Sequence, residues 1–272
     1  MSNDQEWYLE YKKNPYALIR LFCFHHSGGG ASSYYPWIDQ LSHNIEMIAV
    51  QLPGRENRFS EPLNNSVEDI VAQLSKKFSV YTDKPFFTFG HSLGALISFE
   101  FIKAVHQSFS VYPHHMIISA TKAPHLPFRM EHLSQLNDKT LKEQLRIYNG
   151  IDERILNNNE ILDLFLPIIK SDFSIYETYN FSDSKPFPCD ILALSGMEDK
   201  TVTTEEILGW EKYTEGKFEH LSFPGEHFFV RDNQKRILEI INQLGDSCTQ
   251  NINGKDLEPA QAMATATFLS PV

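Results

Sequence analysis

One pentapeptide in the chain has the residue types and spacing of an activated serine. Residues 90–94 read Gly-His-Ser-Leu-Gly, a G-x-S-x-G pattern with Ser92 at its centre. An apolar, β-prone run at residues 86–89 precedes it, and a helix-forming run at residues 95–102 follows it. A strand, tight turn and helix in this order strain the serine backbone and expose its Oγ. The alternative is a chance occurrence of the G-x-S-x-G pattern, which is expected in a Gly/Ser-rich loop. The two glycines let the turn close against the neighbouring strand and helix. Ser92 is therefore predicted to be a nucleophile.

A serine nucleophile needs a histidine base and an acid that orients the histidine, and both follow the serine in the chain. A buried-strand pattern over residues 189–196 leads into Asp199, and the next strand pattern leads into His227. Because loops at the carboxyl ends of parallel strands collect catalytic groups, both side chains are expected at one edge of the sheet. Asp199 is predicted to be the acid and His227 the base. Each has an adjacent rival, Glu198 and Glu226, and Glu198 is the first alternative for the acid.

Acyl transfer also needs donors for the oxyanion. A glycine-rich loop at residues 25–33 follows the first predicted strand. The backbone N–H groups of Ser27, in this loop, and of Leu93, after the nucleophile, are the candidate donors. The loop could instead bind phosphate, but neither G-x-G-x-x-G nor the P-loop lysine pattern is present. Its two adjacent histidines face opposite ways on an extended segment and have no carboxylate at ligand spacing, so no metal site is predicted.

Taken together, the motifs resemble those of the type II thioesterases, the free-standing editing hydrolases of polyketide, nonribosomal peptide and fatty-acid assembly lines. The resemblance extends from about residue 16 to residue 244 and rests on the order and spacing of residues 24–29, 52–58, 90–94, 166–172, 196–199 and 225–229. It implies an α/β-hydrolase fold with a helical lid. It also implies Ser92, Asp199 and His227 as the catalytic triad, with the Ser27 and Leu93 amides as the oxyanion hole. No cofactor is expected, because the phosphopantetheine arm belongs to the carrier-protein substrate.

Three positions depart from the usual family motifs. His25 stands where proline or tyrosine is usual, and Ser27 stands where a small apolar residue is usual. Residues 170–172 read Lys-Ser-Asp where many members have Arg-Ala-Asp. None of these positions belongs to the triad, so the expected consequence is a difference in lid contacts to the substrate.

Strand and helix patterns alternate along the chain, which predicts a mostly parallel sheet with helices on both faces. The alternation stops from about residue 125 to residue 181, where apolar residues recur at helical spacing over 138–148 and 159–179. This segment is predicted to be a helical lid over the active site, with extra helical packing on the core as the alternative. Phe165 and Phe173 of the lid are candidate substrate contacts. Residues 1–244 are expected to form the hydrolase domain, and residues 245–272, which lack clear periodicity, a flexible tail.

Length, composition and charge limit the class of protein. The 272 residues are enough for one α/β domain. Neither a secretory leader nor a run of 18 apolar residues is apparent, and the three cysteines are odd in number without C-x-x-C spacing, so a cytoplasmic protein without a membrane span is expected. The net charge of −11 argues against nucleic-acid binding.

The same net charge affects recognition of a carrier protein. Carrier proteins are generally acidic, so docking one requires a local basic patch. Arg55 and Arg58 are candidates for that patch. The alternative is that both arginines hold their own loop by pairing with Glu56, Glu61 or backbone carbonyls.

The predicted reaction is hydrolysis of an acyl or aminoacyl thioester on a phosphopantetheinyl carrier protein, through an acyl-serine. Triad chemistry alone does not separate thioesters from esters. A serine esterase or lipase acting on small esters is therefore one alternative, and a non-catalytic hydrolase-fold binding protein is another. The complete triad argues against the second of these, and the motif set argues against the first.

Overall fold

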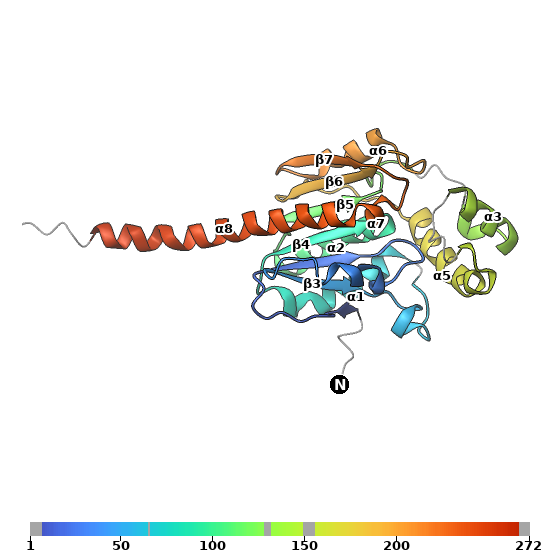
Figure 1. Ribbon diagram of the computed structural model, residues 1–272, viewed down its shortest axis with the longest axis horizontal. Helices are drawn as coiled ribbons and strands as arrows, with labels where there is room; N and C mark the ends of the chain where they lie inside the picture. Colours follow the sequence, from blue (N-terminus) through green and yellow to red (C-terminus); the bar gives the residue numbers. More distant parts are fainter. Residues whose placement is uncertain (1–6, 65, 128–131, 149–155, 267–272) are drawn as a thin grey trace, which may run out of the picture.

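The computed structural model describes residues 7–64, 66–127, 132–148 and 156–266, and its centre is a seven-stranded sheet (Figure 1). The strand order is β1-β3-β2-β4-β5-β6-β7. All neighbouring strands are parallel except β1 and β3, which are antiparallel. The strands are β1 Tyr8–Leu9, β2 Ile19–Phe24, β3 Ile45–Val50, β4 Phe86–His91, β5 His115–Ser119, β6 Asp190–Gly196 and β7 Phe218–Phe223. The prediction of a mostly parallel sheet is confirmed, and β1, only two residues long, was not anticipated.

The helices connect these strands. The α-helices are α1 Val67–Lys77, α2 Leu93–Phe109, α3 Asp138–Tyr148, α5 Asn159–Thr178, α6 Thr204–Leu208, α7 Phe229–Asp232 and α8 Gln234–Ala266. The Ser66 side chain caps α1 by accepting the Asp69 N–H at 3.1 Å. The segment between β2 and β3 contains a 3-10 helix over Ala31–Trp37, and its Pro36 cannot donate a helical hydrogen bond.

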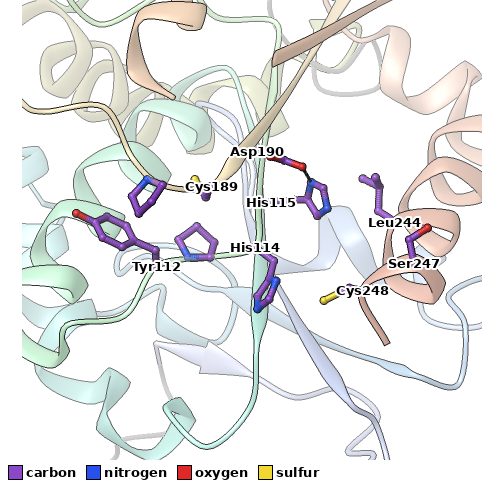
Figure 2. Close-up of a pocket in the computed structure, with 10 residues that line it drawn as sticks. Tyr112, His114, His115, Cys189, Asp190, Leu244, Ser247 and Cys248 are labelled. Atoms are coloured by element: carbon purple, nitrogen blue, oxygen red, sulfur yellow. Dashed lines mark ion pairs between the residues drawn. The ribbon is translucent and has the colours of Figure 1, made fainter. Parts of the chain in front are cut away.

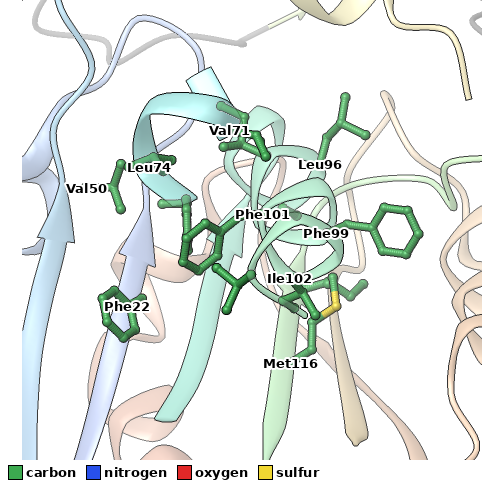
Figure 3. Close-up of a cluster of buried hydrophobic side chains, with 14 of the residues drawn as sticks. Phe22, Val50, Val71, Leu74, Leu96, Phe99, Phe101, Ile102 and Met116 are labelled. Atoms are coloured by element: carbon green, nitrogen blue, oxygen red, sulfur yellow. The ribbon is translucent and has the colours of Figure 1, made fainter. Parts of the chain in front are cut away.

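Alternate strand residues pack on opposite faces of the sheet. On one face, Phe22 and Met116 belong to a buried cluster with Leu74 of α1 and Phe101 of α2 (Figure 3). On the other face, Leu21 and further residues of β3 to β6 are buried with Ile237, Leu238 and Ile241 of α8. Helices therefore cover both faces, and the sheet is held rigid where its strands end.

Helices α3 and α5 form a separate layer beyond one end of the sheet (Figure 1). They share a small apolar cluster of buried residues, Leu133, Leu141, Leu145, Leu156, Leu162, Leu166 and Ile169. The Lys170 ammonium of α5 also pairs with Asp138 of α3 at 2.6 Å. Between residues 125 and 181, the described part of the chain contains no strand. This segment is the predicted lid.

The carboxyl-terminal segment differs from the expectation of an irregular tail after residue 244. Helix α8 continues through this boundary to Ala266, and its far half extends beyond the sheet (Figure 1). Gly245 lets the helix approach the core, since a Cβ there would lie 2.8 Å from Ile45 Cδ1. Cys248 and Thr249 are buried one turn later. Packing against the domain therefore extends at least to Thr249. Despite its length, neither α8 nor any other helix in the described ranges has an apolar stretch sufficient to cross a bilayer.

Candidate active site

Ser92 lies at the sharp turn between β4 and α2. Its backbone has φ of 55° and ψ of −119°, a conformation that L residues rarely adopt. Gly90 and Gly94 permit this turn: a Cβ on Gly90 would lie 2.4 Å from Ala95 Cα, and one on Gly94 would lie 2.1 Å from Phe24 O. The steric role predicted for both glycines is confirmed. The Ser92 amide donates to the Ser119 carbonyl at 2.8 Å, which ties the strained turn to β5.

Asp199 and His227 meet at the same edge of the sheet. Asp199 follows β6, His227 follows β7, and His227 Nδ1 lies 2.9 Å from Asp199 Oδ2. The Asp199 side chain is 2% exposed. Burial acts to raise the pKa of Asp199, but hydrogen bonds from His227 and Thr201 outweigh it, so the pKa lies below its usual value. Asp199 therefore stays ionised at neutral pH and holds the Nδ1–H tautomer of His227, which leaves Nε2 as the basic nitrogen.

Thr201 is a residue of this site that the sequence reasoning did not identify. Its Oγ1–H and its backbone N–H both donate to Asp199 Oδ1, at 2.7 and 2.8 Å. Thr201 Oγ1 also lies 2.9 Å from His227 Nδ1. Both oxygens of the Asp199 carboxylate are thereby engaged and its orientation is fixed. The only signal in the sequence is a threonine two residues after an aspartate, which is typical of many turns.

The rival carboxylate Glu198 has a different role. Its side chain accepts a hydrogen bond from the Gly225 amide across the loop that precedes His227. Glu198 thus stabilises the loop before His227. Of Glu198 and Asp199, only Asp199 contacts the His227 imidazole in the described part of the chain.

His91 packs beside His227, with their ring centroids 5.3 Å apart. His91 is 4% exposed, and its Nδ1 lies 2.9 Å from Ser119 Oγ. Burial first, and then the neighbouring His227 and His26 rings, lower the pKa of His91 well below its usual value. His91 therefore remains neutral and does not oppose a positive charge on His227. His91 lies in the sharp turn between β4 and α2 that carries Ser92, the nucleophile elbow. This position agrees with a role in shaping the turn.

The glycine-rich loop lies against the first turn of α2. The Cβ that Gly94 lacks would lie 2.7 Å from the His25 carbonyl, so the segment before Ser27 touches the elbow directly. Within the described residues, no group accepts a hydrogen bond from the backbone amides of Ser27 and Leu93. Burial and the nearby Arg55 charge lower the pKa of His25 to about 3, so this imidazole adds no charge to the loop. The position of both amides is compatible with the predicted oxyanion hole.

The prediction that Arg55 and Arg58 contact a carrier protein is wrong, because both side chains are buried. They are 3% and 4% exposed. Arg55 forms two hydrogen bonds with Asp172 of α5, at 2.7 and 2.8 Å. Arg58 pairs with Glu61 at 2.6 Å and lies over the Trp7 ring, 4.4 Å from its centroid. The alternative, that these arginines hold their own loop, describes Arg58 well, whereas the partner of Arg55 comes from the predicted lid.

Phe165 and Phe173 are half-buried on α5 and pack against the apolar cluster shared with α3. Nearby, a hollow of about 330 Å³ lies between the first turns of α2 and the end of α5, and Leu96, Tyr176 and Phe181 line part of it. Leu96 is one helical turn beyond Ser92. Lys122, His125 and Asn180 also line the hollow, so it is mixed in polarity. Contact of Phe165 and Phe173 with an acyl chain stays a prediction.

A different hollow, of about 470 Å³, lies at the opposite end of the strands, where β5 and β6 begin (Figure 2). It is lined where β5 and β6 begin and by α8, with His115, Asp190 and Cys248 among its side chains. The proposed triad lies where strands end, so this hollow does not belong to the same site. The described residues hold no cluster of histidine, cysteine and carboxylate side chains suited to a metal ion.

Comparison with known proteins decides the family. The model of the thioesterase domain matches residues 19–244. The chain belongs to the thioesterase family. This thioesterase is 35% identical to the gramicidin S biosynthesis protein GrsT of Aneurinibacillus migulanus over 242 residues, which cover 89% of this chain and 94% of GrsT. It is 33% identical to thioesterase PikA5 of Streptomyces venezuelae over 247 residues, which cover 88% of this chain and 84% of PikA5.

The comparison of structures agrees. The type II thioesterase BorB from the borrelidin biosynthetic cluster superposes with a TM-score of 0.81 at 31% identity, covering 87% of this thioesterase and 96% of BorB. The resemblance to type II thioesterases, the α/β-hydrolase fold and the assignment to thioester hydrolases are confirmed by these matches.

Proposed function

We propose that this thioesterase removes acyl or aminoacyl groups from phosphopantetheinyl carrier proteins, as an editing enzyme of polyketide or nonribosomal peptide synthesis. The observation that supports it most is the Asp199–His227 pair, whose imidazole packs on His91, the residue before the strained Ser92. The relatives of this chain also include a type II thioesterase of such a pathway. The partner is then an acyl or peptidyl carrier protein. The proposed reaction uses only groups of the protein and water.

In the proposed mechanism, His227 Nε2 accepts the Ser92 hydroxyl proton while Oγ attacks the thioester carbonyl carbon. The Ser27 and Leu93 amides stabilise the oxyanion of the tetrahedral intermediate. The C–S bond then breaks, and the phosphopantetheine thiolate leaves with the proton held by His227. A thiol pKa of about 8.5 makes this a good leaving group. His227 next deprotonates a water molecule, which attacks the acyl-serine and releases the free acid and Ser92.

The experiment compares three substrates: an acyl group on a phosphopantetheinylated carrier protein, the matching small thioester and the matching oxygen ester. We expect kcat/KM to be highest for the loaded carrier, because contacts remote from the carbonyl help to orient it for attack. Ser92→Ala should lose both hydrolysis and labelling by a serine-directed fluorophosphonate. Efficient cleavage of the ester with no activity on the carrier would indicate an esterase. Carrier binding by wild type without turnover or labelling would indicate a non-catalytic binding protein.

A further inference from the structure

The Asp172 carboxylate, on the predicted lid helix α5, is buried against the loop that contains Ser27. Asp172 is 0% exposed. Its Oδ2 accepts the Gly28 backbone N–H at 2.7 Å and Arg55 Nη1 at 2.7 Å, and its Oδ1 accepts Arg55 Nη2 at 2.8 Å. A bidentate guanidinium and a backbone amide are strong partners for a buried carboxylate, which would otherwise be costly to desolvate.

The same turn of α5 contacts the surrounding loops through its other side chains. Ile169 packs on Gly28, where a Cβ would lie 3.2 Å from Ile169 Cγ1, and Gly28 has φ of 72°. Ser171 Oγ donates to the Asn64 carbonyl at 2.6 Å. Arg55 completes the connection by donating to the Gly29 carbonyl at 3.2 Å. The turn at residues 169–172 is therefore the point at which α5 is fixed to the glycine-rich loop.

The Gly28 N–H belongs to the peptide group that links Ser27 to Gly28. Because a peptide group is planar, a hydrogen bond to the Gly28 N–H also restricts ψ of Ser27, and it thereby limits movement of the loop that carries the Ser27 amide. The Ser27 amide is the proposed oxyanion donor, and such a donor is effective only when it is oriented before the charge develops. A lone carboxylate nearby would repel that charge, so the Arg55 guanidinium is needed to neutralise it.

We propose that Asp172 is a positioning residue that holds the oxyanion loop through Gly28, and that Arg55 neutralises the Asp172 charge so that it does not oppose the oxyanion. The proposal rests on the proposed function in one respect, the role of the Ser27 amide. It has a consequence for the lid: the oxyanion hole is complete only while the 169–172 turn of α5 is seated on the loop.

The kinetic test uses a small acyl thioester, whose binding does not depend on a carrier. We expect Asp172→Asn to lower kcat by about 10- to 100-fold, less than the loss seen when an oxyanion donor is removed, with KM within about 2-fold. Arg55→Met should lower kcat further, because it leaves an unpaired carboxylate. Adding Asp172→Asn to Arg55→Met should restore kcat to the level of Asp172→Asn alone. Arg55→Lys, which keeps the charge but loses the two-point contact, should lie between wild type and Arg55→Met.

The matched control is Asp163→Asn, at an exposed position of α5 whose carboxylate pairs with Lys142 of α3. It should leave kcat unchanged. Thermal unfolding midpoints establish that each variant is folded. If the other variants do not fold, the kcat of Arg55→Lys, the mildest change, provides the test. A folded Asp172→Asn with wild-type kcat would overturn the proposal. So would equal losses of kcat in Asp172→Asn and Asp163→Asn, or a double variant worse than Arg55→Met.

A second measurement separates this inference from the proposed function. Amide hydrogen exchange of residues 25–30, followed without substrate, should be faster in Asp172→Asn than in wild type and unchanged in Asp163→Asn. Faster exchange in a protein whose wild type hydrolyses no thioester would refute the function and leave the structural coupling intact. Unchanged exchange in an active enzyme would refute the coupling and leave the function intact.

Discussion

At the scale of single residues, strain and burial at the site are stabilised by specific neighbours. Ser92 keeps an unfavourable backbone conformation because Gly90 and Gly94 leave room for the turn and because its amide is bonded to Ser119. Asp199 keeps a buried charge because Thr201 and His227 donate to it. These neighbours, rather than the three proposed catalytic groups alone, determine whether the site is organised before substrate binds.

Asp199→Asn should leave the fold intact and lower kcat by up to about 10⁴-fold, because an amide no longer holds His227 in the required tautomer. The comparison is Glu198→Gln, which alters the adjacent carboxylate that bonds to Gly225 and should change kcat little. Steady-state kinetics with circular dichroism on both variants make the test. Full activity in Asp199→Asn would move the acid role to another residue.

Thr201→Val tests how Asp199 is held. Hydrogen bonds to charged groups are worth about 1.5–3 kcal/mol, so we expect a loss of this order in the free energy of unfolding at pH 7. The Asp199 pKa is lowered in the folded state, so its stabilising contribution is present above the unfolded value of about 3.9 and is lost as pH falls through the folded pKa. The difference between wild type and Thr201→Val should therefore shrink in acid. Urea unfolding across this pH range measures it, and a difference independent of pH would contradict the assignment.

At the scale of elements, α5 contacts two neighbours, the glycine-rich loop and α3. Its 169–172 turn is bonded to the glycine-rich loop, and Phe165 and Phe173 pack on the apolar cluster that α5 shares with α3. Apolar contacts are not directional, and the two ion pairs between α3 and α5 are partly exposed, so α3 can shift more easily than the 169–172 turn. Any gating movement of the predicted lid is thus expected first in α3.

Phe165→Ala and Phe173→Ala should change the preference among acyl chain lengths more than the hydrolysis of an acetyl thioester. The physical reason is that apolar surface beside a long acyl chain is lost, whereas an acetyl group does not reach it. Leu164→Ala, at a position on the same helix that is 62% exposed, is the control and should change neither. Equal effects on long and short substrates would indicate simple destabilisation.

At the scale of the whole molecule, α8 covers one face of the sheet and then continues past it. Ending the chain after Gln250 should preserve the unfolding temperature and kcat, because Ile237, Leu238, Ile241 and Cys248 remain to fill the core. Ending it after Ile240 removes Ile241 and Cys248. Burial of one large apolar side chain contributes about 1.5–3 kcal/mol, a large share of the roughly 5–15 kcal/mol that stabilises a domain. Differential scanning calorimetry on both truncations checks this, and equal stability would show that α8 packs only loosely.

Features that depend on neighbouring residues could be predicted from the sequence. The elbow follows from a strand pattern, a glycine-flanked serine and a helix pattern in direct succession, and the parallel sheet follows from the alternation of these patterns. The order of Ser92, Asp199 and His227 placed each of them where a strand ends. These predictions succeeded because local steric constraints and hydrophobic periodicity depend on residues that are close together in the chain.

The identity of partners that are distant in the chain became visible only in the folded protein. The Asp172 partner of Arg55 lies 117 residues away in the chain, and no periodicity connects the two. Both Arg55 and Arg58 looked available for a carrier, because an arginine in a polar loop gives no local sign of burial. The continuation of α8 beyond residue 244 was not predicted either. Part of this helix is stabilised by the contact of Gly245 with Ile45, which the hydrophobic periodicity of the segment does not indicate. Buried ion pairs and packing contacts depend on how elements approach in space, which the linear pattern does not specify.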